Sequence, residues 1–362
     1  STIANGYSTH ATLCANCDRI LGDPSMHRIA YAICLALIAC GPPAGGGTGN
    51  GNADAGPPAP PPGPEVNFEC PDGAPSISNG MNDSWPYGGA DGNTRKFHAL
   101  IPNVDGDTKV GVVFSWHGIG QDLESWVQGT RVDNAQPDFP FIVISPHDSG
   151  MQPQDDPPGL YWDMLYSSPG DDNREAILFE SIMGCLLLDY RIDTKRLYSV
   201  GFSGGAVTTN MLQVRYPDLF AATAPMSGAW FSDPAQVDMV DPSGRGQQFL
   251  PGLGVEWNDM EAGQETILIT HGGDNDDYGM LGIEVINFHN ANVAAIDYLT
   301  ANGRNVIDCP HTQGHRQHPS FWIPDLVGFM KAHTWHEPSP YAENLPEPFS
   351  GAGCRFYPAA SP

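Results

Sequence analysis

The sequence predicts an α/β protein with a mostly parallel central sheet and helices on both faces of that sheet. Short apolar runs alternate with longer segments of helical apolar spacing between residues 110 and 333. The apolar runs contain few polar residues, as expected for strands that are covered on both faces. One predicted strand also passes directly into a predicted helix through Gly-Phe-Ser-Gly-Gly at residues 201–205.

The predicted strands are short runs rich in Val, Ile, Phe and Ala, and they cover residues 110–118, 139–146, 196–203, 220–228 and 266–273. The predicted helices show apolar residues at helical spacing and cover residues 174–190, 204–217, 282–303 and 319–333. Pro217 and Gly303 end two of these helices. This order predicts one domain over residues 67–357, with a long insert at residues 229–265.

The segments before this domain have the features of export and tethering. Residues 26–39 combine a short basic start with an apolar run about half as long as a membrane span, and we interpret them as a signal peptide. The following Cys40 ends a lipobox-like LIAC, which predicts a lipid-anchored protein or, alternatively, a secreted one. Residues 40–66 are rich in Gly and Pro and are predicted to be a tether. Residues 1–25 are interpreted as a leader of doubtful origin, because Met26 is the predicted natural start.

The charge balance is strongly acidic. The chain has 16 Lys and Arg against 42 Asp and Glu, which gives a formal net charge of −26. Nucleic acids and anionic membrane surfaces attract basic proteins, so neither is a predicted partner. Membrane contact is expected only through a lipid on Cys40. The oligomeric state is not predicted.

Four cysteines lie in the predicted domain, and an even number in an exported protein indicates two disulfides. Three pairings are possible. We favour Cys70 with Cys354, which would join the domain ends, and Cys185 with Cys309. The CANC sequence at residues 14–17 is a single pair and is assigned no metal.

Ser203 is the predicted nucleophile. Gly201 to Gly205 match G-x-S-x-G between a strand and a helix, which is the context of a nucleophile elbow. The glycines on either side allow a turn in which larger side chains would clash. The Gly204 N–H can then face a developing oxyanion at the helix N-terminus.

The acid and the base are expected later in the chain, in the order serine, acid, histidine. The strand at residues 266–273 runs into an acidic loop with Asp274, Asp276 and Asp277 as candidates. We predict Asp276 as the triad acid, with Asp274 as the alternative.

Three histidines compete for the base, namely His311, His315 and His318. We predict His315, which follows Gly314. His311 and His315 are four residues apart, a spacing that on a helix would let both bind one metal ion. Pro310, Gly314 and Pro319 disfavour a helix there. No metal and no organic cofactor are predicted.

The loop after the first predicted strand should supply the second oxyanion donor, and we predict the Ile119 N–H. His117 is interpreted as holding this turn and is not assigned a catalytic role. Trp230, Trp162 and Trp322 are predicted to contact the substrate. The insert at residues 229–265 leaves the sheet near the site, so it is expected to form part of a lid or binding wall.

Several of these stretches resemble the polyhydroxybutyrate depolymerase and feruloyl esterase group of α/β-hydrolases. The resemblance covers roughly residues 110–333, and it rests on HGIGQ (117–121), RIDTKRLYSVGFSGG (191–205), YPDLFAATAPMSG (216–228), HGG with following acids (271–277) and CPHTQGH (309–315). It implies the α/β-hydrolase fold and serine ester hydrolysis with Ser203, an acid in residues 274–277 and His315. The implied substrates are hydroxyalkanoate polyesters, feruloyl or acetyl esters on plant polysaccharides, and small acyl esters.

This chain departs from the family pattern in two places. Ile119 stands where many members have a small residue or cysteine, and the acid loop holds more aspartates than usual. Two other functions remain as alternatives: a serine peptidase of the same fold and a non-catalytic surface protein that uses the fold for binding.

Overall fold

The computed structural model describes residues 63–89, 94–129, 140–148, 162–163, 173–230, 263–280 and 283–360. All of these residues belong to the compact unit Pro61–Pro362. The predicted leader, signal peptide, Cys40 and most of the tether lie outside the described residues, as do residues 231–262 of the insert. Among the described residues, no helix is both long enough and apolar enough to cross a membrane.

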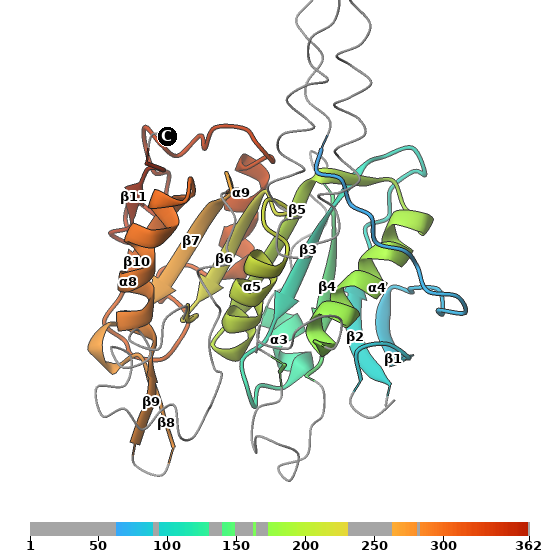
Figure 1. Ribbon diagram of the computed structural model, residues 1–362, viewed down its shortest axis with the longest axis horizontal. Coiled ribbons are helices and arrows are strands. Elements are labelled where there is room, and N and C mark those ends of the chain that lie inside the picture. The colour runs from blue at the N-terminus through green and yellow to red at the C-terminus, as the bar shows by residue number, and fades with distance from the viewer. Residues whose placement is uncertain are drawn as a thin grey trace, which may run out of the picture. The chain divides into compact units, whose positions relative to one another are not determined.

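A large, mostly parallel sheet forms the centre of this unit (Figure 1), and its strand order is β1-β2-β4-β3-β5-β6-β7-β10-β11. The strands, in chain order, are β1 (Gly80–Trp85), β2 (Arg95–Leu100), β3 (Val110–Trp116), β4 (Phe141–Pro146), β5 (Ile192–Phe202), β6 (Ala222–Met226), β7 (Thr266–His271), β10 (Asn305–Pro310) and β11 (Arg355–Tyr357). The six neighbouring strands β4, β3, β5, β6, β7 and β10 pair in parallel. On one side of them β2 pairs antiparallel with β4 and with β1, and on the other side β11 pairs antiparallel with β10.

Helices cover both faces of the sheet. Figure 1 shows α4 (Arg174–Asp189), α5 (Gly204–Arg215) and α8 (Phe288–Ala301) on the near face, with α3 (Leu123–Gly129) and α9 (Ile323–Ala332) behind. Successive strand residues point to opposite faces, so β3 contributes Val112 and Phe114 to one core and Val113 to the other. This arrangement is the α/β-hydrolase fold that the sequence predicts.

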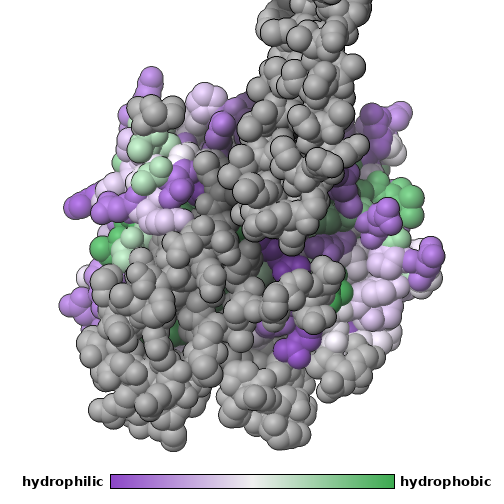
Figure 2. Space-filling model, in the orientation of Figure 1, coloured by the Kyte–Doolittle hydropathy of each residue, from purple (hydrophilic) through white to green (hydrophobic). Residues whose placement is uncertain are grey.

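On the face shown in Figure 2, the coloured residues are mostly hydrophilic, with small apolar patches between them. The large apolar side chains that are exposed among the described residues are few and scattered, namely Met81, Val104, Leu188 and Val293. Such isolated side chains are normal on a soluble domain.

The predicted helix at residues 282–303 is wrong at its start. Residues Ile283–Asn287 form strand β9, which pairs with β8 (Asp277–Met280) in a separate two-stranded sheet. The helix α8 begins only at Phe288, because the Asn287 side chain accepts a hydrogen bond from the Asn290 N–H and caps it. Three of the four residues in Ile-Glu-Val-Ile (283–286) are β-branched, which favours the strand.

The favoured disulfide pairing is also wrong. The bonds join Cys70 to Cys185 and Cys309 to Cys354. Cys185 lies on α4, against which residues 69–70 pack so closely that a β-carbon at Gly184 would clash with the Glu69 carbonyl group. Cys309 is on β10, which pairs with β11 directly after Cys354. Each disulfide therefore joins two cysteines that are far apart in the sequence and are brought together by the packing of the folded chain.

Candidate active site

Ser203 lies in the sharp turn between β5 and α5, with φ 54° and ψ −122°. A positive φ is costly for a residue with a side chain, and such strain is typical of functional turns. The turn requires its glycines, because a β-carbon at Gly201 would clash with the Gly205 carbonyl and one at Gly205 would clash with the Trp116 carbonyl. The sequence therefore allows α5 to approach the end of β3 closely and presents the Ser203 hydroxyl at the carboxyl edge of the sheet.

His315 lies in the loop between β10 and α9, and its Nε2 is 2.8 Å from the Ser203 Oγ. The imidazole is held between two aromatic rings, Phe202 on one side and Phe288 on the other, with centroid separations of 5.0 and 4.7 Å. Both rings are nearly parallel to the imidazole. This stacking restricts the rotation of the ring and keeps Nε2 directed at the serine.

Asp276 completes the arrangement. It follows β7 and a 3₁₀ turn (η4, Gly273–Asn275), and its Oδ1 lies 2.7 Å from the His315 Nδ1. A carboxylate only accepts, so the His315 Nδ1 carries the proton and Nε2 is left as an acceptor for the Ser203 hydroxyl. The Asp276 side chain is fully buried, whereas that of Asp274 is 98% exposed. The geometry therefore favours Asp276 over the alternative acid.

The other oxygen of Asp276 has two donors of its own. Its Oδ2 accepts from the Ser227 hydroxyl at 2.9 Å and from the Gly272 N–H at 2.7 Å. Ser227 follows β6 with φ 50°, and its N–H donates to the Thr270 carbonyl. Ser227 is not among the predicted site residues, although a Ser-Gly pair at the end of a strand is a signal for a turn.

The two predicted oxyanion donors are adjacent in the structure. A β-carbon at Gly204 would lie 2.7 Å from the Ile119 Cγ1, so the loop after β3 packs directly against the serine turn. Gly204 is the first residue of α5, where a backbone N–H has no partner within the helix.

The three predicted substrate-contacting tryptophans are all packed against other groups. Trp162 and Trp230 are 1% exposed and belong to the core on the α5 face. The half-buried Trp322 donates its indole N–H to the Gly129 carbonyl and packs edge-on against Trp126. Substrate contact by these residues stays a prediction, because most of the adjoining insert lies outside the described residues.

The two competing histidines have structural contacts. The Nδ1 of His311 accepts from the Gln313 N–H, and the Nδ1 of His318 accepts from the Ser320 N–H. Burial lowers the pKa of His318 to about 4, so this residue stays neutral near pH 7. Neither histidine contacts Ser203 among the described residues.

A second carboxylate–imidazole chain lies close by. The Asp308 Oδ1 is 3.0 Å from the His271 Nε2, and the His271 Nδ1 is 2.9 Å from the His289 Nδ1. Among the described contacts, no serine or cysteine side chain is hydrogen-bonded to this Asp308–His271–His289 series. It connects the ends of β7 and β10 with the start of α8.

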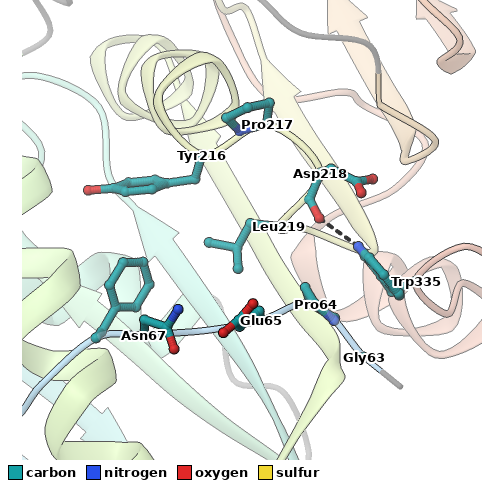
Figure 3. A pocket seen from close by; sticks show the side chains of 10 residues that line it. Gly63, Pro64, Glu65, Asn67, Tyr216, Pro217, Asp218, Leu219 and Trp335 are labelled. Carbon is teal, nitrogen blue, oxygen red and sulfur yellow. Dashed lines mark hydrogen bonds between the residues drawn. The ribbon is translucent and has the colours of Figure 1, made fainter. Parts of the chain in front are cut away.

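A cavity of about 420 Å³ lies at the opposite end of α5 from Ser203 (Figure 3). It is lined by residues 63–65, 67–68, 216–219 and Trp335. Two of its lining residues are paired, since the Trp335 indole donates to the Asp218 carbonyl and the Asp218 carboxylate contacts His336. Ser203, Asp276 and His315 do not line this cavity, so it is separate from the candidate active site.

Residues 97–251 match the family model described as Esterase PHB depolymerase. The stretch that this model matches includes Ser203 and is less than half of the chain. It is 31% identical to a feruloyl esterase B of Thermothelomyces thermophilus over 42% of this chain and 52% of that protein. It is 27% identical to a feruloyl esterase B of Neurospora crassa over 63% of this chain and 79% of that protein.

Other relatives are named as an acetylxylan esterase and as a polyhydroxyalkanoate depolymerase. The chain is 28% identical to a probable acetylxylan esterase A of Neosartorya fischeri over 38% of this chain and 37% of that protein. It is 36% identical to a poly(3-hydroxyalkanoate) depolymerase C of Paucimonas lemoignei over 17% and 15%. The match therefore spans about half, or less, of most of these relatives.

Solved structures share the fold. The native pOPH structure has a TM-score of 0.59 and 17% identity, and the match covers 82% of this chain and 98% of that one. Native sOPH has a TM-score of 0.58 and 19% identity over 80% and 97%. At this level of identity the similarity concerns the fold alone.

Proposed function

We propose that the protein is a serine carboxylic ester hydrolase in which Ser203 is the nucleophile, His315 the base and Asp276 the acid. The observation that carries this proposal is the unbroken chain from the Asp276 carboxylate through the His315 imidazole to the Ser203 hydroxyl, with contacts of 2.7 and 2.8 Å. A nucleophile, a base and a group that orients the base are what acyl transfer requires. The match of residues 97–251 to an esterase family model supports the same chemistry.

The reaction proceeds by two acyl transfers. His315 removes the Ser203 proton as Oγ attacks the ester carbonyl, and the negative charge on the carbonyl oxygen is stabilised by the N–H groups of Gly204 and Ile119. His315 then protonates the leaving alcohol, which leaves an acyl group on Ser203. Water, deprotonated by the same imidazole, attacks the acyl-enzyme and releases the acid.

The proposed substrates are feruloyl or acetyl esters of plant polysaccharides, with hydroxyalkanoate polyesters as the second class. The relatives named feruloyl esterase B and acetylxylan esterase support the first class, and the relative named depolymerase C supports the second.

Export is part of the proposal, and a lipid anchor on Cys40 is the form that we favour. The disulfides Cys70–Cys185 and Cys309–Cys354 support export, because such bonds persist in oxidising compartments. Mass spectrometry of Cys40-containing peptides from the native host would test the anchor.

The experiment is a substrate panel with wild type and Ser203→Ala. The panel contains p-nitrophenyl acetate, butyrate and octanoate, methyl ferulate, acetylated xylan and a polyester emulsion. We expect hydrolysis of at least one member and none by Ser203→Ala, and a fluorophosphonate should label only the wild type. A folded wild type that neither hydrolyses the panel nor takes the label would contradict the proposal and favour a binding role. Labelling without hydrolysis of any ester would favour the peptidase alternative.

A further inference from the structure

In the loop after β3, three hydrogen bonds hold the backbone carbonyl and the backbone N–H of Gly118. The Gly118 carbonyl accepts from the His117 Nδ1 at 2.8 Å and from the Gln121 N–H at 3.1 Å. The Gly118 N–H in turn donates to the Gln121 Oε1 at 2.8 Å. Because a carbonyl oxygen only accepts, the His117 Nδ1 must carry a proton.

These contacts fix the direction of the next N–H. In a trans peptide the carbonyl and the following N–H point to opposite sides, so two donors on the Gly118 carbonyl also orient the Ile119 N–H. The Ile119 N–H has no hydrogen-bond partner within the part of the chain that the structure describes. It is therefore an available donor beside Gly204, against which the Ile119 side chain packs.

Trp162 holds the preceding peptide. Its indole Nε1 donates to the His117 carbonyl at 3.0 Å, and its ring packs against the His117 imidazole with a centroid separation of 4.8 Å. The indole Cδ1 would lie 3.1 Å from a β-carbon at Gly204. One buried side chain thus contacts both halves of the proposed oxyanion hole.

The segment that carries Trp162 is anchored to a buried ion pair. The N–H of the adjacent Asp163 donates to the Glu175 carboxylate, which pairs with Arg95 at 2.8 Å. Both charged side chains are at most 1% exposed. Arg95 also donates to the His147 carbonyl directly after β4. The indole is therefore fixed relative to the sheet.

We propose that His117 and Trp162 are positioning residues that hold the Gly118–Ile119 peptide with its N–H towards the oxyanion. The proposal rests on the proposed esterase function. Neither side chain needs to touch the substrate, because each acts through a backbone carbonyl. A rotated peptide would present the Gly118 carbonyl oxygen to the developing negative charge, which would destabilise the transition state.

The first test compares two Trp→Phe substitutions that each remove one buried indole hydrogen bond. Trp162→Phe removes the bond to the His117 carbonyl, and Trp85→Phe removes a bond of the same 3.0 Å length to the Ser181 hydroxyl in the core. We expect kcat on the best panel ester to fall about 10-fold in Trp162→Phe, less than the 10²–10³-fold that loss of a whole donor causes. KM should change little, since the donor acts in the transition state. Trp85→Phe should keep the wild-type kcat.

The second test uses the shape of the His117 side chain. In His117→Asn the amide nitrogen can take the place of the imidazole Nδ1 and donate to the Gly118 carbonyl, whereas His117→Leu has no donor. We expect kcat to fall in His117→Leu and to be largely restored in His117→Asn. The affinity for a boronic acid transition-state analogue should follow the same order.

Thermal melting curves accompany both tests and confirm that each variant is folded. The inference is overturned if Trp162→Phe keeps the wild-type kcat, if Trp85→Phe loses as much, or if His117→Asn is no better than His117→Leu. If His117→Leu does not fold, the two Trp variants decide alone. Failure of the proposed function is recognised separately, because the wild type itself would then hydrolyse no ester.

Discussion

Two carboxylate–imidazole pairs lie at the same edge of the sheet, and they connect the same two strands in opposite directions. Asp276, in the loop after β7, reaches His315 after β10. Asp308, on β10, reaches His271 at the end of β7. The two pairs contain the same groups at similar distances, 2.7 and 3.0 Å.

The pairs differ in what the second imidazole nitrogen meets. The His315 Nε2 faces the Ser203 hydroxyl, and its side chain is 25% exposed. The His271 side chain is 2% exposed, and its Nδ1 faces another imidazole, that of His289. A carboxylate–imidazole pair is therefore not sufficient for a nucleophilic site. The strained serine and the access to solvent distinguish the proposed catalytic pair from a structural one.

The largest expected difference comes from removing each histidine. His315→Ala should lower kcat by about 10⁶-fold, as loss of a triad base does. His271→Gln should keep most of the activity and lower the melting temperature by several degrees, because it disturbs buried hydrogen bonds. Ester hydrolysis rates and melting curves of both variants provide the measurement. A similar loss of kcat in the two variants would contradict the assignment.

The two acids should differ in the same way. Asp276→Asn should lower kcat by about 10⁴-fold, because the amide no longer holds the His315 tautomer that accepts the serine proton. Asp308→Asn keeps an acceptor for the His271 N–H and should remain close to wild type in kcat. Steady-state kinetics of the matched pair test this, and Asp274→Asn serves as an exposed control.

Ser227→Ala should have a smaller effect on the catalytic pair. It removes one of the donors to the Asp276 Oδ2 but leaves the Gly272 N–H in place. We expect kcat to fall by about 10-fold or less, since one hydrogen bond to a charged group contributes roughly 1.5–3 kcal/mol and part of it is recovered by relaxation. A kcat of Ser227→Ala as low as that of Asp276→Asn would contradict this expectation and show that Ser227 has a role beyond its hydrogen bond to Asp276.

The smallest expected effect is on the pH dependence of stability, and it comes from His289, which contacts the Asp308–His271 pair. Burial, and next the neighbouring His271, lowers the pKa of His289 below its ordinary value of 6.5. The unfolded chain then binds more protons than the folded one just below pH 6.5, so stability falls as the pH drops through this window. His289→Gln should remove this contribution, so the melting temperature of the variant should fall less than that of the wild type as the pH drops below 6.5. The same dependence of melting temperature on pH in His289→Gln and in the wild type would contradict this role of His289.

Local patterns predicted the centre of this protein well. Strands β3, β4, β6 and β7 are short apolar runs that are buried on both faces, and this burial produces their uniform composition. The antiparallel strands β1 and β2 were missed, because polar or charged residues interrupt their apolar ones and only one residue of β1 is buried. The β8–β9 hairpin was missed because its second strand runs directly into α8.

The sequence by itself determined the nucleophile turn, because steric limits on a strand-to-helix turn act over five residues and demand glycine at fixed positions. It also limited the acid and the base to two short loops. Only the tertiary structure decided which carboxylate meets His315, that Ser227 supports it, that Trp162 reaches the His117 carbonyl, and which cysteines pair. These contacts join residues 39 to 115 positions apart. Their distances depend on how the strands are ordered and how closely the helices pack, which no local pattern records.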